Sequence, residues 1–96
     1  MSRIASDSLD RLFDVILHLH TKDECYSFFE DLCTMRELKD LSARLDVAVL
    51  LEHGQNYQQV ADETGVSSAT ISRVKRALEY GSGGYKLMIS RMEEKE

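Results

Sequence analysis

Residues 57–76 have the sequence YQQVADETGVSSATISRVKR, and their spacing predicts a helix-turn-helix. The small Ala61 stands where two crossing helices come closest, and a larger side chain there would push them apart. Four residues later, Gly65 can adopt the positive φ of the turn without steric cost. The apolar contacts between the helices are predicted at Val60, Val66, Ile71 and Val74. We therefore expect a first helix over about Gln58–Thr64 and a second over about Ser68–Glu79.

The second of these helices carries small or basic residues on its outer side. Ser67 can cap its start, which leaves the residues that follow free to face a ligand. A small and basic helix face suits the major groove of DNA, which is about 12 Å wide. The predicted DNA-binding residues are Ser67, Ser68, Ala69, Thr70, Ser72, Arg73, Lys75 and Arg76. The alternative is an ordinary helical hairpin, whose outer face need be neither small nor basic.

Each residue type on this face suits a particular contact with DNA. Arg73 and Arg76 can bind guanine O6 and N7 or a phosphate, and the sequence leaves both contacts open. Lys75 suits phosphate, because its ammonium group is a compact point charge. Ala69 and Thr70 suit the methyl group of thymine.

The charge of the chain is unevenly distributed. Its 96 residues include 12 Lys and Arg against 17 Asp and Glu, for a net charge of −5. Residues 1–56 carry six basic and eleven acidic residues, whereas residues 57–96 carry six of each. An acidic body with one locally basic helix argues against a non-specific electrostatic coat on DNA and favours positioned contacts.

The rest of the chain predicts an all-α fold of about six helices, because it has no Pro, few Gly and no strictly alternating segment. We expect Ser8 to cap a first helix over about Leu9–His20, followed by a second over about Asp23–Cys33. Apolar residues cover more of both helices than a small monomer can bury. The sequence therefore predicts a homodimer.

A third helix of about twenty residues is predicted to begin at a capping box of Thr34 and Glu37 and to end at a left-handed Gly54. The glycines of residues 81–84 form a break before a last helix over about Tyr85–Met92, after which the last four residues are expected to fray. We expect a single domain over residues 1–96. Its predicted parts are dimerisation helices at 9–54, the helix-turn-helix at 57–80 and a C-terminal helix at 85–92.

The sequence gives no support for catalytic or metal chemistry. His18 and His20 point to different sides of a helix, and no Cys-x-x-Cys or His-x-x-x-His motif accompanies them. Cys25 and Cys33 lie about 12 Å apart along one helix, too far for a disulfide, and are expected to be reduced. We expect no catalytic residue, no metal site and no cofactor. No membrane span of about 20 apolar residues and no signal peptide is visible, so a cytoplasmic protein is expected.

The segments TMRELKDLSAR at 34–44 and ATISR at 69–73 resemble the tryptophan repressor superfamily, specifically its YerC/YecD-type members. The resemblance covers about Leu9–Met92. It implies a six-helix subunit that interlocks with a second copy, with two helix-turn-helix heads about one DNA turn, roughly 34 Å, apart. It also implies a transcriptional regulator, in this case a repressor, that binds a near-palindromic operator.

The resemblance implies a candidate effector pocket as well. In the tryptophan repressor the amino acid is held by two arginines, and Arg44 and Arg73 stand at the matching positions. The glycine that follows the second arginine there is replaced by Val74, which we expect to fill part of the pocket, so tryptophan is disfavoured. Two alternatives stay open: the two arginines bind another small anion, or Arg44 forms an ion pair with Asp40 on its own helix. The candidate pocket residues are Thr34, Arg44, Arg73 and Val74.

Two other functions stay open. A helix-turn-helix can also bind a protein, which a net charge of −5 would permit. The salt dependence of the affinity separates DNA binding from protein binding, because phosphate contacts release counterions and weaken steeply as salt rises. A small all-helical dimeric enzyme, similar in fold to chorismate mutase, would need several basic residues along its first helix. Arg11 is the one Lys or Arg between Leu9 and His20.

Overall fold

A computed structural model describes residues 4–94 of the chain. Over this range the backbone forms six α-helices and no strand, which confirms the predicted all-α fold. The chain divides into two compact units, one spanning Met1–Met35 and the other Arg36–Glu96. No helix of residues 4–94 is long and apolar enough to cross a membrane.

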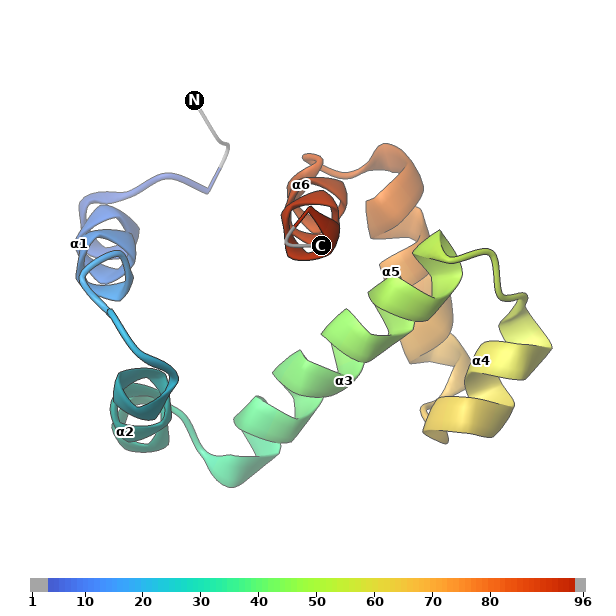
Figure 1. The fold of residues 1–96 in the computed structure, drawn as a ribbon, viewed down its shortest axis with the longest axis horizontal. Helices are drawn as coiled ribbons and strands as arrows, with labels where there is room; N and C mark the ends of the chain where they lie inside the picture. The colour runs from blue at the N-terminus through green and yellow to red at the C-terminus, as the bar shows by residue number, and fades with distance from the viewer. Residues whose placement is uncertain (1–3, 95–96) are drawn as a thin grey trace. The chain divides into compact units, whose positions relative to one another are not determined.

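The first unit contains α1 (Asp7–Ile16) and α2 (Lys22–Leu32) (Figure 1). The prediction that Ser8 caps α1 is wrong. The N-cap is Ser6, whose side chain accepts a hydrogen bond from the Leu9 backbone N–H at 3.1 Å. Ser6 has the extended backbone that aims an N-cap hydroxyl at the third helical residue, whereas Ser8 already lies inside the first turn.

α1 also ends earlier than the predicted His20. Beyond Ile16, the His18 N–H donates to the Val15 carbonyl and the Leu19 N–H donates to the Ile16 carbonyl, both at 3.0 Å. These bonds span three residues instead of four, a tightening that is common where a helix stops. The apolar pattern therefore continues past the point at which the helical backbone ends.

α2 begins after Thr21, whose hydroxyl accepts a hydrogen bond from the Glu24 N–H at 3.1 Å. The Glu24 carboxylate in turn accepts one from the His20 N–H at 2.8 Å. With Thr21 as the N-cap, α2 starts one residue before the predicted start. Its end also lies one residue earlier than predicted. Cys25 and Cys33 are free thiols, and both are half-buried.

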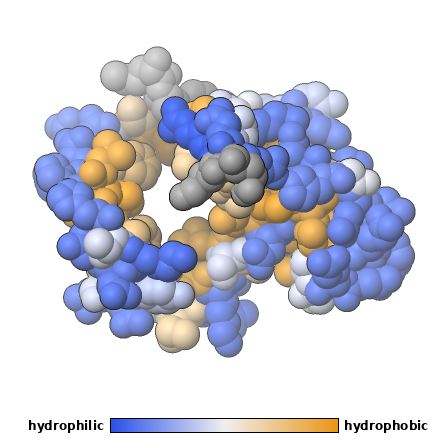
Figure 2. Space-filling model, in the orientation of Figure 1, coloured by the Kyte–Doolittle hydropathy of each residue, from blue (hydrophilic) through white to orange (hydrophobic). Residues whose placement is uncertain are grey.

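The first unit leaves much apolar surface open. Neither α1 nor α2 contains a buried residue. Phe13 is 49% exposed, Leu17 80% and Tyr26 65%, and apolar side chains are visible at the surface of this unit in Figure 2. Phe28 and Phe29 pack edge to face with ring centroids 5.5 Å apart. Apolar side chains on both helices therefore remain accessible in this unit.

The second unit takes in nearly all of α3 (Met35–Glu52), together with α4 (Tyr57–Thr64), α5 (Ser68–Tyr80) and α6 (Gly84–Glu93). Its buried residues form one cluster to which all four helices contribute. They are Val47, Ala48, Val60, Ile71, Val74 and Ile89. Figure 1 shows α3 as the longest helix, with α4 joined to its C-terminal end by a loop. This core fixes the helix-turn-helix on the end of α3.

The two ends of α3 lie close to the predicted ones. The helix begins at Met35, directly after the predicted cap Thr34, and has 18 residues. After its end, Gly54 has a φ of +93°, the left-handed conformation predicted for it.

α6 is joined to the end of α3 by two polar side-chain contacts. Lys86 Nζ lies 3.3 Å from Glu52 Oε1, and His53 pairs with Glu93. The helix extends one residue beyond the predicted range at each end. The fraying predicted for the last four residues lies partly outside the described residues.

Candidate nucleic-acid interface

A capping box that the sequence analysis missed holds the start of α4. The Asn56 side chain accepts a hydrogen bond from the Gln59 N–H at 2.9 Å, and the Gln59 side chain accepts one from the Asn56 N–H at 2.8 Å. The signal for it is an Asn followed three residues later by a Gln. Because Asn56 is the cap, α4 begins at Tyr57, one residue before the predicted start. Within α4, the Gln58 side chain donates a hydrogen bond to the Asp62 carboxylate, one turn later, at 2.9 Å.

The turn between α4 and α5 has the predicted geometry. Gly65 has a φ of +72°, and its N–H donates to the Ala61 carbonyl at 2.9 Å. A Cβ at this position would meet no heavy atom within 4 Å, so the turn needs glycine for its backbone angle and not for space. The Thr64 hydroxyl donates to the Val60 carbonyl at 2.8 Å and accepts from the Val66 N–H at 3.3 Å. These bonds join the end of α4 to the turn.

The predicted apolar contacts between the two helices are confirmed. Val60 of α4 and Ile71 and Val74 of α5 are fully buried in the shared core. Ala61 and Val66 are half-buried and pack against the same core. The buried side of α5 is therefore held against α4, which fixes its opposite side toward solvent.

Seven of the eight predicted DNA-binding residues are exposed. The eighth, Thr70, is half-buried, because it lies on the same face of α5 as Val74. Within residues 4–94, no acidic side chain forms an ion pair with Arg73, Lys75 or Arg76. α5 thus presents three cations that are available for phosphates or base edges. Ser67 is the N-cap of α5, as predicted, and accepts a hydrogen bond from the Thr70 N–H.

A pocket of about 360 Å³ lies between α3 and the start of α5. It is lined by Asp40, Ala43, Arg44, Val66, Ser67, Thr70 and Arg73. Two residues of the candidate effector pocket, Arg44 and Arg73, therefore meet at one cavity. Arg44 and Asp40 form no ion pair with each other, although both line it.

Of the other two residues of the candidate effector pocket, Val74 belongs to the second unit and Thr34 to the first. Val74 is 1% exposed and belongs to the core, and it is not among the residues that line the pocket. It follows Ile71 by three positions, which places both on the buried side of α5. Thr34 belongs to the first unit and is exposed.

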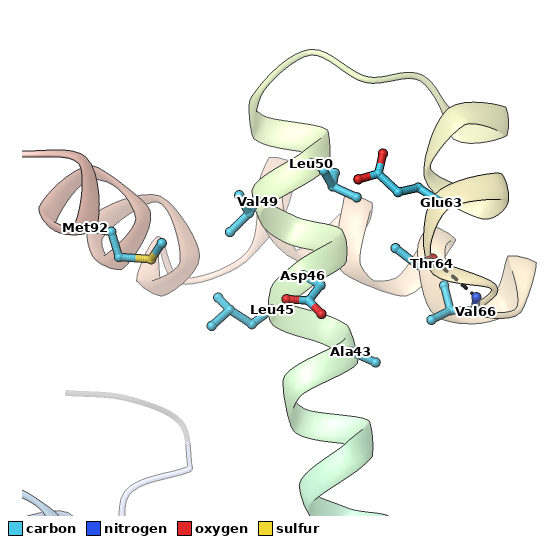
Figure 3. A pocket seen from close by; sticks show the side chains of 9 residues that line it. All are labelled: Ala43, Leu45, Asp46, Val49, Leu50, Glu63, Thr64, Val66 and Met92. Atoms are coloured by element: carbon cyan, nitrogen blue, oxygen red, sulfur yellow. Dashed lines mark hydrogen bonds between the residues drawn. The ribbon is translucent and has the colours of Figure 1, made fainter. Parts of the chain in front are cut away.

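A neighbouring pocket of about 500 Å³ lies between α3, the end of α4 and α6 (Figure 3). Its charged lining consists of the carboxylates of Asp46 and Glu63, and no Lys or Arg lines it. Because carboxylates repel phosphate, this pocket does not extend the candidate DNA interface. Within residues 4–94, no group of three or more His, Cys, Asp or Glu side chains is placed to hold a metal ion.

The sequence matches a known family over most of its length. The family model described as Trp repressor protein matches residues 7–93. The chain belongs to the Trp repressor family. It is also 46% identical over 96 residues to the uncharacterized protein YerC of Bacillus subtilis (strain 168), a match that covers 100% of this chain and 92% of that relative. The resemblance found in the sequence is confirmed.

Solved structures share this Trp repressor fold. A crystal structure from Staphylococcus aureus, of a protein proposed to be a Trp repressor, superposes with a TM-score of 0.90 at 46% identity and covers 95% of this chain and 91% of that one. A TrpR-like protein from Eubacterium eligens ATCC 27750 also has a TM-score of 0.90, at 43% identity, with 95% of this chain and 94% of that chain covered. The six-helix arrangement is therefore that of Trp repressor-like proteins.

Proposed function

We propose that this member of the Trp repressor family is a sequence-specific DNA-binding regulator that represses transcription by occluding a promoter. The observation that carries the proposal is the outer face of α5, on which small side chains and three unpaired cations stand exposed. The buried side of the same helix is anchored in the core, so the exposed face can enter the major groove as a rigid unit. No reaction chemistry is part of this function.

The protein is proposed to act as a homodimer in the cytoplasm. The open apolar side chains of α1 and α2 support this, since neither helix buries a residue on its own. Two copies related by a twofold axis would present two α5 helices, about one DNA turn apart, to a near-palindromic operator.

A small anion is the proposed effector, bound between Arg44 and Arg73. Two guanidinium groups at one cavity, with the hydroxyl of Thr70, supply donors for a carboxylate or phosphate. Tryptophan is disfavoured, because the apolar lining of this cavity comes from Ala43 and Val66 and includes no aromatic side chain.

The test is a selection of fragmented genomic DNA by the purified protein at about 0.15 M salt, with and without tryptophan, followed by sequencing. We expect enrichment of one near-palindromic site that is insensitive to tryptophan. Enrichment only with tryptophan would overturn the effector proposal. No enrichment under either condition would favour the alternative of a helix-turn-helix that binds a protein. Affinity for the selected site should fall steeply as salt rises, since phosphate contacts release counterions.

A further inference from the structure

Arg73 belongs to two surfaces of α5. It is one of the exposed cations among the predicted DNA-binding residues, and it also lines the cavity between α3 and the start of α5. Arg73 follows Thr70, which lines the cavity, by three residues, and it precedes Arg76, which does not, by three. Because residues three apart are neighbours on a helix surface, Arg73 lies at the border between the cavity and the outer face of α5.

The cavity carries a net positive charge. Arg44 of α3 and Arg73 of α5 bring two positive charges to it, and Asp40 brings one negative charge. Within residues 4–94, no ion pair joins these three side chains to one another or to other residues. Arg44 is half-buried, so water and salt screen its charge less than that of an exposed arginine. Both guanidinium groups are therefore available to an oxyanion.

A bound oxyanion changes the charge at the edge of the DNA-binding face. A carboxylate cancels the net positive charge of the cavity, and a doubly charged phosphate reverses it. Either anion also engages N–H groups that Arg73 would otherwise offer to a base edge or to the DNA backbone. Lys75 and Arg76 do not line the cavity, so they remain available to DNA when it is filled.

We propose that an oxyanion bound between Arg44 and Arg73 weakens DNA binding, so that the effector is an inducer that releases a repressor from its operator. This inference rests on the proposed function, since it needs Arg73 to contact DNA. Loss of one arginine contact to a base edge lowers affinity about fivefold or more. The effect should level off once the cavity is filled, because the other contacts of α5 persist. By thermodynamic linkage, DNA lowers the affinity of the anion by the same factor.

The first experiment establishes binding of the anion without DNA. Inorganic phosphate and succinate are the two probes, and each is compared with chloride at the same ionic strength. NMR signals of the Arg44 and Arg73 side-chain N–H groups are followed in the full chain. We expect at least one probe to shift these signals to saturation, and the probe that does so shows whether the cavity prefers a phosphate or a carboxylate. No shift with either probe would overturn this inference and the proposed anionic effector together.

Fluorescence anisotropy then measures affinity for the selected DNA site as the bound probe is added. The wild-type affinity should fall about fivefold or more and then level off, whereas chloride at the same ionic strength should produce no such step. Arg44→Gln removes one guanidinium group from the cavity and leaves Arg73 in place. The affinity of this variant, compared with its own value without the probe, should no longer respond. A response retained in Arg44→Gln would overturn the proposal.

Lys39→Gln is the matched control, because Lys39 is an exposed cation of α3 that does not line the cavity. It should respond to the probe as the wild type does. Loss of the response in Lys39→Gln as well would mean that the general charge of α3 causes the effect, and it would overturn the role of the cavity.

The reciprocal measurement needs no variant. The affinity of the probe is measured by NMR for the free protein and for the protein saturated with its DNA site, and it should fall by the factor found in the anisotropy titration. Unchanged or tighter DNA binding with the cavity filled would overturn the inference and leave the proposed function intact. If the wild type selects no DNA site, the proposed function fails and this inference with it.

Discussion

α4 and α5 pack together in one helix-turn-helix, yet they differ in charge. α4 contains two acidic residues, Asp62 and Glu63, and no basic one. α5 contains three basic residues and a single acidic one, Glu79. Both helices bury apolar side chains in the same core. If the proposed function is right, the basic side chains that attract phosphate therefore come from α5, while α4 supports α5 through the shared core.

This division of roles separates three kinds of variant. Changes to the cations of α5 should alter DNA binding and leave the fold intact. Changes to the turn or to the cap of α4 should lower the stability of the fold. Changes to the acidic residues of α4 should alter only the electrostatic part of DNA binding.

The largest effect is expected from the double variant Arg73→Ala with Arg76→Ala. Each arginine that binds a base edge contributes about 1–3 kcal/mol, so loss of both should lower affinity for the selected site about 30-fold or more. Both side chains are exposed and form no ion pair within the described residues, so the melting temperature should change by no more than about 2–4 °C. Fluorescence anisotropy and thermal melting measure the two quantities.

The control for the double variant is Arg91→Ala on α6, where another arginine is exposed outside the helix-turn-helix. It should keep nearly full affinity. If the double variant still bound its site as tightly as the wild type, α5 would not be the recognition helix.

The next effect is on stability, from Gly65→Val in the turn. A β-branched residue at a φ of +72° is strained by about 1–3 kcal/mol, which should lower the melting temperature by about 5–15 °C. Gly84→Ala is the control, because Gly84 has no positive φ and a Cβ there would meet nothing within 4 Å. An unchanged melting temperature of Gly65→Val would contradict the left-handed turn.

A smaller loss of stability is expected from Asn56→Ala. The substitution removes the side-chain acceptor for the Gln59 N–H and should cost about 1 kcal/mol, or about 4–8 °C in melting temperature. Asn56→Asp keeps the acceptor and should retain the wild-type melting temperature. Equal melting temperatures for the alanine and aspartate variants would show that the capping box does not stabilise α4.

The helix-turn-helix could be predicted from the sequence because its signals are local. Gly65 has the left-handed φ that its place in the turn requires, and Ser67 caps the helix that follows it. The spacing of the apolar residues also gave the buried side of α5 correctly. Each of these features depends on residues within a few positions of one another.

Features that depend on a choice between similar local signals were harder to predict. Ser6 and Ser8 are both competent caps, and only the backbone angles select Ser6. The end of α1 at Ile16 is not marked by Gly or Pro, so the apolar pattern suggested a longer helix. The resemblance predicted that Val74 fills part of the effector pocket, and the structure places it on the buried side of α5, three residues after Ile71.

The smallest effect is expected from Asp62→Asn with Glu63→Gln, which removes the negative charge of α4. Two carboxylates about 10 Å from phosphates in high dielectric each repel by a few tenths of a kcal/mol, so their removal should raise DNA affinity about two- to fourfold. The gain should shrink as salt rises from about 0.05 M to 0.3 M, because the Debye length falls below that separation. Anisotropy titrations of wild type and variant across this range measure both trends. A loss of affinity would mean that these side chains contact DNA directly, and α4 would then share in recognition with α5.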